Sequence, residues 1–336
     1  MKEGVLSIIG DTPLVKLSRY FRGAGFNLYA KLESLNPGGS TKDRPAFTII
    51  EQGITSGAVK PDTVIIESSS GNMGIGLAQA CSYFGLRLIC VVDPKTTTQN
   101  IRLLRAYGAE VDIVGAPDPE TGEYLQARID RVQQLLRETE NSFWPNQYAN
   151  VYNPMAHYQT MREIDTALEG KVDYLFCAVS TCGTLRGCAE YIREHGLSTR
   201  IYAVDAVGSV IFGGEKAKRL IPGHGAAVRP ELYRADLAYE CIHVADVECV
   251  IGCRNLARYE AILAGGSSGA VFSAFERAQE ELTSGASCVL MFPDRGERYL
   301  DTIYSDDWVR EHFSSVEHLW QTPPTVKDES CETVMF

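Results

Sequence analysis

The sequence lacks the features of a membrane, nucleic-acid-binding or secreted protein. It contains no run of 18 or more apolar residues, so no segment is long enough to span a bilayer as a helix. Acidic residues outnumber basic ones by 43 to 32, and the net charge of −11 disfavours binding to nucleic acid or anionic lipid. The N-terminal residues also lack the apolar stretch of a secretory signal, so we expect a cytoplasmic protein.

The sequence also lacks the usual spacing of a structural metal site. Its ten cysteines include no Cys-x-x-Cys pair, and its six histidines are scattered along the chain. Thiols in a reducing compartment stay free. We therefore expect neither disulfides nor a bound metal.

The length and composition are typical of an enzyme with two α/β domains. The chain has 336 residues, 45% of them hydrophobic, which is more than one compact core usually holds. Short apolar runs alternate with segments of helical periodicity, which predicts parallel strands joined by helices. The predicted strands are residues 62–66, 86–92, 110–114, 172–178, 200–206 and 287–292, and the predicted helices are residues 74–84, 97–107, 121–139 and 246–263, with a further helix from Ser268.

The segment 36–44 places a lysine in an unusual position. Pro37 and two glycines predict a turn, and Ser40 can cap a helix that continues through Pro45. Lys42 then lies in the first turn of that helix, where the helix dipole lowers the pKa of an amine. A lysine with a lowered pKa can bond covalently to an aldehyde, although an exposed, solvated lysine also fits this position.

Four further turns are rich in glycine and hydroxyl groups and lie next to predicted strands or helices. Free backbone N–H groups in such turns can bind a carboxylate or a phosphate. Each turn taken alone is more often a simple helix cap, but their joint order is much more specific. The turns are residues 69–74, 180–184, 265–269 and 293–299.

In this order, the lysine and the turns resemble those of the cysteine synthase family, the β-replacing pyridoxal 5′-phosphate (PLP) enzymes of fold type II. The resemblance extends from residue 10 to residue 300. It implies two three-layer αβα domains with mostly parallel sheets, as in the tryptophan synthase β-subunit. The smaller domain, residues 41–150, would carry the substrate carboxylate loop, and the larger PLP-binding domain would contain residues 10–40 and 151–320. Residues 321–336 are expected to form a loose tail.

The resemblance also implies roles for individual residues. Lys42 would bind PLP covalently and act as the catalytic base, Asn72 would hydrogen-bond the ring hydroxyl, and Ser267 would face the pyridine nitrogen. A neutral serine at that nitrogen favours β-elimination over transamination. The cofactor phosphate would be bound by Ser180, Thr181, Cys182, Gly183 and Thr184. The substrate α-carboxylate would be bound by Ser69, Ser70 and the backbone of Met73.

Four segments resemble one branch of this family more closely than ordinary cysteine synthases: residues 36–40, 146–150, 208–213 and 293–296. That branch makes N-(2-amino-2-carboxyethyl)-L-glutamate and phosphate from O-phospho-L-serine and L-glutamate, in siderophore and 2,3-diaminopropionate biosynthesis. Glutamate would be bound by Arg128, Tyr148 and Ser180. Arg128 lies on a helix rich in charged residues and is equally compatible with a solvated side chain.

Two residues depart from the usual phosphate turn of the family. Ser180 and Cys182 occupy positions where glycine is expected. Ser180 would add a hydroxyl at the cofactor end of the site. Cys182 is interpreted as structural rather than as a nucleophile.

Two alternatives stay open. A cysteine synthase that depends on O-phosphoserine or O-acetylserine would share the PLP residues but use sulfide. A non-catalytic member would bind PLP and serve as a partner subunit, although Lys42 and the turn at 69–74 argue against it. The resemblance further implies a homodimer and a downstream NAD-dependent dehydrogenase. Because glutamate must attack with an unprotonated amine, we expect activity to rise with pH through the neutral range.

Overall fold

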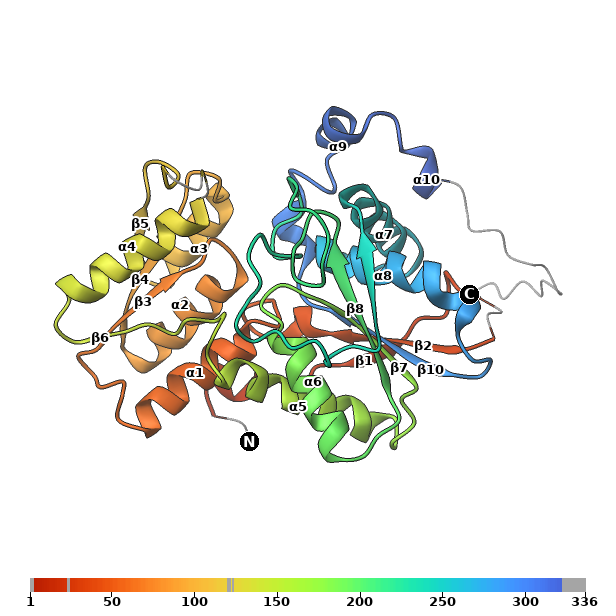
Figure 1. The fold of residues 1–336 in the computed structure, drawn as a ribbon, viewed down its shortest axis with the longest axis horizontal. Coiled ribbons are helices and arrows are strands. Elements are labelled where there is room, and N and C mark those ends of the chain that lie inside the picture. Colours follow the sequence, from red (N-terminus) through yellow and green to blue (C-terminus); the bar gives the residue numbers. More distant parts are fainter. Residues whose placement is uncertain (1–2, 23–24, 120–121, 123, 322–336) are drawn as a thin grey trace.

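The computed structural model describes residues 3–22, 25–119, 122 and 124–321 of the chain. Two lobes, each built on its own β-sheet, lie side by side (Figure 1). The tail expected at residues 321–336 lies outside the described residues except for Gln321, the last residue of a short helix. No helix in the described part of the chain is both long and apolar enough to cross a membrane.

The smaller lobe contains a four-stranded parallel sheet. In spatial order its strands are β5 (Glu110–Ile113), β4 (Arg87–Val92), β3 (Val64–Ser68) and β6 (Ser142–Phe143). One face packs against α1 (Asp43–Thr55), α2 (Asn72–Phe84) and α3 (Thr98–Ala106), and the other packs against α4 (Tyr124–Glu138). Alternate residues enter the two cores, since Ile65 belongs to the core with α1 and α2 whereas Ile66 belongs to the core with α4.

The larger lobe contains a six-stranded sheet. In spatial order its strands are β1 (Leu14–Lys16), β2 (Asn27–Leu32), β10 (Ser287–Phe292), β7 (Tyr174–Ala178), β8 (Arg200–Ala206) and β9 (Glu240–Val244). The β1–β2 pair is antiparallel and the other pairs are parallel. Helices α5 (Tyr152–Ala167) and α6 (Gly183–Glu194) cover one face, and α7 (Asp246–Tyr259) and α8 (Gly266–Ala278) cover the other. The last described helices are α9 (Asp306–Phe313) and α10 (His318–Gln321).

The two lobes match the α/β fold expected from the resemblance. We propose residues 41–150 as the smaller domain and residues 10–40 with 151–320 as the larger one, because the strands of each sheet fall within these ranges. Helix α1 packs against α2 of the smaller lobe and α5 of the larger lobe, so it joins the two. An irregular connection, residues 207–239, joins β8 to β9.

Strands buried on both faces are predicted best from the sequence. The strands expected at residues 200–206 and 287–292 are confirmed with the same bounds, and the strand expected at residues 62–66 spans Val64–Ser68 instead. Such strands read as continuous apolar runs. Four strands were not predicted: β1, β2, β6 and β9.

Two helix ends differ from the expectation. The helix predicted over residues 246–263 ends at Tyr259, because Ala261 has a φ of 56°, which a right-handed helix does not contain. The helix expected to begin at Ser268 begins at Gly266. The turn at residues 265–269 is therefore the first turn of α8 rather than a loop before it.

Three of the predicted anion-binding turns follow the carboxyl ends of parallel strands. Residues 69–71 follow β3, residues 179–182 follow β7, and residues 293–295 follow β10. The first two turns lead into the N-termini of α2 and α6. Ligands of open α/β sheets bind at these ends of the strands, so the fold gathers the turns where a ligand is expected.

Candidate active site

Lys42 lies immediately before the first residue of α1. Its N–H donates to Ser40 Oγ at 3.2 Å, and the preceding residue, Thr41, donates its N–H to Pro293 O at 2.7 Å. The prediction that Ser40 caps the helix is wrong, because α1 begins at Asp43 and no side chain caps it. These backbone contacts place Lys42 next to the carboxyl end of β10.

The pKa of Lys42 is lowered, as the sequence predicts. Burial of the side chain lowers it, and the carboxylates of Asp294 and Glu33 partly oppose that effect. The main cause of the lowered pKa is therefore burial rather than the helix dipole expected from the sequence. A lowered pKa leaves more of the neutral amine, which is the form that bonds to an aldehyde and accepts a proton.

Buried ion pairs hold the first turn of α1, which directly follows Lys42. Arg44 donates from Nε to Glu33 Oε2 and from Nη1 to Glu163 Oε1, both at 2.7 Å. Lys31 on β2 also donates to Glu163, at 2.6 Å, and Thr12 donates to Glu33 at 2.7 Å. Two cations and two carboxylates balance each other. Arg44 and Lys31, with the hydrogen bond from Thr12, lower the pKa of Glu33 to about 2 despite its complete burial.

Asn72, the first residue of α2, is held by side chains of the other lobe. Its Nδ2 donates to Asp294 Oδ2 at 2.8 Å, and Tyr299 donates its hydroxyl to the same oxygen at 2.5 Å. Arg298 donates to Asn72 Oδ1 and to Gly38 O. These contacts fix the Asn72 amide close to the end of β10, beside the segment that carries Lys42.

Asp294 is buried against the start of α8. A Cβ at Gly265 would lie 2.0 Å from Asp294 Oδ1, so only a glycine leaves room for this carboxylate. Burial raises the pKa of Asp294, while Lys42 is close enough to lower it. Ser267, the second residue of α8, is 8% exposed and therefore faces a largely enclosed space.

The turn after β3 is held by one of its own side chains and by a side chain of α3. Ser69 Oγ accepts the N–H of Gly74 at 2.9 Å, and Ser70 O accepts Asn100 Nδ2 at 2.9 Å. Met73 is buried in the core between α1 and the sheet. The Ser69 and Ser70 hydroxyls can still donate a proton to a carboxylate, at the N-terminus of α2 where the helix dipole favours a negative charge.

The turn after β7 is supported from α5. Thr181 Oγ1 accepts from Gly183 N and from Asn153 Nδ2, both at 3.2 Å, and a Cβ at Gly183 would lie 2.0 Å from Asn153 Oδ1. Thr184 Oγ1 lies 3.3 Å from Nε2 of His157, whose burial lowers its pKa to about 3 and keeps it neutral. The N–H groups that begin α6 are suited to a phosphate.

Cys182 occupies the position before α6 in a left-handed conformation, with a φ of 64°. Its side chain is 2% exposed, and burial raises its pKa to about 12. A neutral, enclosed thiol is a poor nucleophile, which supports the structural interpretation. Ser180, two residues earlier, is half-buried at the end of β7.

The residues present fit the cofactor that the resemblance implies. Buried polar groups are normally paired, and unpaired ones mark places for a ligand or water. A molecule with a phosphate, a ring nitrogen and a hydroxyl group offers partners for such atoms. In the segment 36–44, at the end of β3 and in the turns at residues 265–269 and 293–299, five buried side-chain oxygens lack a hydrogen-bond partner among the described residues: Thr41 Oγ1, Asp43 Oδ1, Ser68 Oγ, Ser268 Oγ and Asp294 Oδ1.

Two arginines that come from different lobes act on Tyr148 through their charges. The positive charges of Arg128, on α4, and of Arg219, in the 207–239 connection, both lower its pKa, although burial raises it overall. Arg128 Nε lies 3.4 Å from Asp93 Oδ2 in an ion pair, but it makes no hydrogen bond to the described residues. Arg219 donates to His224 O at 2.8 Å, and its Nε is likewise unpaired there.

Glu67 is a buried carboxyl group whose charge also acts on Tyr148. It accepts Ser68 N at 2.8 Å, Trp144 Nε1 at 3.1 Å and Gln147 N at 3.4 Å. Burial nevertheless raises its pKa to about 7, and its charge raises the pKa of Tyr148. Glu67 therefore changes its charge near neutral pH, next to the predicted glutamate-binding residues.

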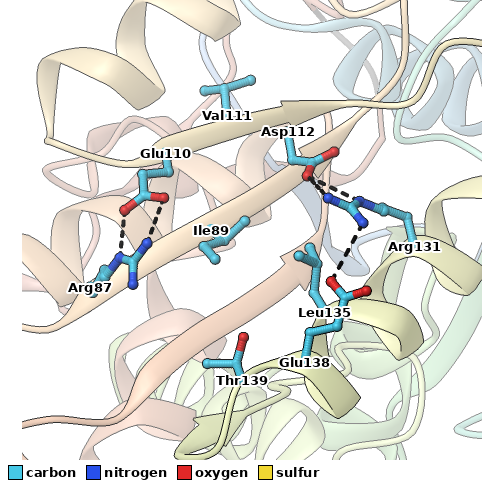
Figure 2. Close-up of a pocket in the computed structure, with 9 residues that line it drawn as sticks. All are labelled: Arg87, Ile89, Glu110, Val111, Asp112, Arg131, Leu135, Glu138 and Thr139. Atoms are coloured by element: carbon cyan, nitrogen blue, oxygen red, sulfur yellow. Dashed lines mark hydrogen bonds and ion pairs between the residues drawn. The ribbon is translucent and has the colours of Figure 1, made fainter.

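A hollow on the smaller lobe is not part of this site. It has a volume of about 390 Å³ and lies between β4, β5 and α4 (Figure 2). Its charged side chains are paired with one another: Arg87 pairs with Glu110 at 2.5 Å, and Arg131 pairs with Asp112 at 2.8 Å and with Glu138 at 3.9 Å. The predicted site residues are not among those that line it.

Several residues of this site were given no role from the sequence alone. Asp294, Arg298 and Tyr299 belong to the turn at residues 293–299, so their segment was identified but their contacts were not. Arg219 lies in an irregular connection, where neither periodicity nor a motif distinguishes it from its neighbours.

A family model described as "Pyridoxal-phosphate dependent enzyme" matches residues 5–294. Two similar proteins are named N-(2-amino-2-carboxyethyl)-L-glutamate synthase. One, from Ralstonia nicotianae, is 46% identical over 308 residues, and the other, from Cupriavidus metallidurans, is 47% identical over 311 residues. Each comparison covers 91% of this chain and 91% of the relative.

Solved structures show the same arrangement of lobes. A hydrogen sulfide-producing enzyme from Fusobacterium nucleatum superimposes with a TM-score of 0.83 at 35% sequence identity. The superposition covers 89% of this chain and 98% of that enzyme.

Proposed function

The chain belongs to the pyridoxal-phosphate dependent enzyme family, as a β-replacement enzyme, and from this premise we propose that it converts O-phospho-L-serine and L-glutamate to N-(2-amino-2-carboxyethyl)-L-glutamate and phosphate. The relatives named for this product support the acceptor. Their names do not include the donor, which we propose from the resemblance of the sequence.

The chain has a group for each part of the cofactor. Lys42 would bind its aldehyde carbon, Ser267 would face its ring nitrogen and Asn72 its ring hydroxyl. The N-terminus of α6, with the turn at residues 180–184, would hold its phosphate. When bound, the cofactor supplies an electron sink for the electron pair left on the substrate Cα after deprotonation.

Lys42 would move the proton at Cα. As a free amine, Lys42 Nζ would accept the Cα proton of phosphoserine, because its lowered pKa leaves it in the neutral form that can take up a proton. The Cβ–O bond then breaks and phosphate leaves. The glutamate amine bonds to Cβ in its place and loses one proton, and Lys42 returns a proton to Cα.

Two sets of residues would orient the substrates. Ser69, Ser70 and the backbone at Met73 would bind the α-carboxylate of phosphoserine at the N-terminus of α2. Arg128 and Tyr148 would bind glutamate, with Ser180 at the cofactor end of the site. The structure adds Arg219 as a second cation beside Tyr148.

The observation that carries the choice of glutamate is the pair of arginines whose charges act on Tyr148 and whose Nε atoms have no hydrogen-bond partner among the described residues. Two guanidinium groups suit an acceptor with two carboxylates, because charge-assisted hydrogen bonds to carboxylates are strong and geometrically specific. Sulfide, the acceptor of a cysteine synthase, has no carboxylate to bind. This cluster therefore favours the proposal over the cysteine synthase alternative.

A product assay tests the proposal. Holoenzyme is incubated with O-phosphoserine and either L-glutamate or sulfide, and with O-acetylserine in place of O-phosphoserine, and the products are identified by mass. The proposal expects the glutamate adduct as the main product with O-phosphoserine. Cysteine as the main product when both acceptors are present would overturn it, as would an absorption spectrum that does not change when phosphoserine is added.

We also propose the wider setting that the resemblance implies: a cytoplasmic homodimer that acts in siderophore or 2,3-diaminopropionate biosynthesis ahead of an NAD-dependent dehydrogenase. Size-exclusion chromatography with light scattering tests the dimer. A coupled assay with NAD and a candidate dehydrogenase tests the sequence of reactions.

A further inference from the structure

Three potential metal ligands meet at one edge of the large sheet, outside the residues assigned to catalysis. Asp205 on β8 and His243 on β9 are direct partners in the parallel register. Cys241 lies two residues before His243, so both side chains lie on the same face of β9. The carboxylate oxygen, the thiol sulfur and the imidazole nitrogen all lie within 4.8 Å of one another.

We propose that Asp205, Cys241 and His243 form a binding site for a thiophilic divalent cation, Zn²⁺ in particular. A thiolate, an imidazole and a carboxylate are the ligands that zinc prefers, whereas Mg²⁺ and Ca²⁺ prefer a shell of oxygen atoms. Three protein ligands leave a fourth tetrahedral position for water.

The distances require only a small adjustment. The ligand atoms of a tetrahedral zinc site are about 3.3–3.8 Å apart, as follows from zinc–ligand distances of about 2.0–2.3 Å. His243 Nε2 lies 3.9 Å from Asp205 Oδ2, close to that range. Contraction of the whole set by about 1 Å is within the reach of side-chain rotation.

The imidazole nitrogen is free to bind an ion. His243 Nε2 is buried and has no hydrogen-bond partner among the described residues. The His243 side chain is 35% exposed, and β9 is the last strand of the sheet, so the three residues lie close to the surface.

The carboxylate of Asp205 is already oriented. Its Oδ1 accepts the N–H of Ala206 at 2.8 Å, and its Oδ2 accepts the N–H of Phe212 at 3.3 Å. An ionised carboxylate has about four lone-pair sites, so two remain for a metal. Hydrogen bonds that orient a ligand in this way are typical of metal sites.

The site adjoins the turn proposed to hold the cofactor phosphate. The charges of Asp205 and Cys241 both raise the pKa of Cys182, which places that thiol close to them. Cys182 is not one of the three residues whose ligand atoms lie within 4.8 Å of one another. The spacing rule applied to the sequence missed the set, because Cys241-x-His243 is completed by a residue of another strand.

Metal titration of the holoenzyme tests the proposal. Protein freed of metal by a chelator is titrated with Zn²⁺ in phosphate-free buffer, and bound zinc is measured by atomic spectrometry. Titration with Co²⁺ gives a second readout, since a cobalt–thiolate bond adds a charge-transfer band to the difference spectrum. Wild-type protein is expected to bind about one equivalent, with the thiolate band present.

Matched variants separate this site from adventitious binding. C241S and H243N are expected to weaken binding at least about tenfold, and C241S also to abolish the cobalt–thiolate band. C288S and H195N, which remove the same residue types elsewhere, are expected to bind as wild type does. Retention of the cofactor absorption band shows that each variant is folded.

Two results would overturn the proposal: no saturable zinc binding by the wild type, or equal binding by wild type, C241S and H243N. Because zinc binding is measured without amino acid substrates, failure of the proposed β-replacement would leave this test unaffected.

Discussion

Lys42 combines a lowered pKa with a fixed backbone position. Its surroundings lower its pKa, because burial outweighs the attraction of Asp294 and Glu33. Its backbone is nevertheless fixed, because Lys42 donates its N–H to Ser40 Oγ and the preceding residue, Thr41, donates its N–H to Pro293 O, so the low pKa is accompanied by a defined position. Both properties suit a residue that bonds to an aldehyde and moves a proton at a single carbon.

The variant K42A tests this role directly. We expect borohydride reduction to leave a pyridoxyl label on Lys42 of the wild type and none on K42A. Loss of the base is expected to lower kcat by roughly 10²- to 10⁴-fold. The exposed Lys60 supplies the control, since K60A should keep both label and activity. A label on K42A, or a peptide map that places it on another lysine, would refute the assignment.

The arginines beside Tyr148 are expected to select the acceptor. Each of R128A and R219A should raise the KM for glutamate by roughly 10- to 100-fold, because a charged hydrogen bond contributes about 1.5–3 kcal/mol. Neither should slow the release of phosphate from phosphoserine. R131A, on the same helix as Arg128, removes an ion pair with Asp112 and serves as the control. Equal losses in both half-reactions would show a structural rather than an acceptor-binding role.

Glu67 gives the stability of the protein a defined pH dependence. Its pKa is about 7 in the folded chain against 4.5 for an ordinary glutamate, so the folded state holds the proton more tightly than the unfolded state. The free energy of unfolding therefore decreases as the pH rises from about 4.5 to about 7. E67Q has no proton to lose, so its stability relative to the wild type should increase by about 3 kcal/mol across that interval.

Urea unfolding at several pH values measures this difference. E110Q is the control: Arg87 lowers the pKa of Glu110, so its loss should shift the pH dependence in the opposite direction. A difference between E67Q and wild type that does not change with pH would show that folding does not raise the pKa of Glu67.

Residues whose chemistry is local could be predicted from the sequence, and residues defined by distant partners could not. Lys42 and the turn at residues 69–74 were identified because each stands out in its own segment. Asp294 becomes noticeable only through its contacts with Asn72 and Tyr299, and the first of these is 222 positions away. Arg219 likewise acquires a role only from its position near Tyr148.

At the level of secondary structure, burial on both faces decided which elements were predictable. The strands β8 and β10 read as apolar runs, and both were predicted with their bounds. Strand β2 was missed because it includes Lys31, a buried cation whose partner Glu163 lies on α5. Strands β1 and β9 lie at the edges of the sheet, where burial gives a weaker pattern.

Helix α1 is held by buried ion pairs of Arg44 as well as by its apolar face. R44M should destabilise the protein by about 3–5 kcal/mol, because it leaves Glu33 and Glu163 buried without their main partner. R87M removes an exposed arginine from its pair with Glu110 and should cost less than about 1 kcal/mol. Chemical denaturation measures both, and equal costs would show that the Arg44 network contributes no more than a surface pair.

In the whole molecule, both lobes contribute residues to the proposed cofactor site. Asn72 belongs to the smaller lobe, whereas Ser267 and the turn at residues 180–184 belong to the larger one. A ligand that contacts all of them stabilises the folded arrangement, because unfolding separates its contacts.

Removal of the cofactor is therefore expected to lower the melting temperature. At a cofactor concentration about 100 times its Kd, the stabilisation is about 2.7 kcal/mol, which corresponds to a shift of roughly 5 °C. Pyridoxal without the phosphate group should stabilise less, because the α6 turn then has no anion to bind. Equal melting temperatures with and without PLP would contradict a site shared by the lobes.

The order of strands in the large sheet has a consequence for how the protein is made. Strand β10 lies between β2 and β7, so strands from residues 27–32 and 174–178 have no shared neighbour until residues 287–292 have left the ribosome. The small sheet uses only residues 64–143 and can form while synthesis continues. Nascent chains should therefore acquire a protease-resistant small lobe early, whereas the ability to retain the cofactor arises only in the last stage of translation.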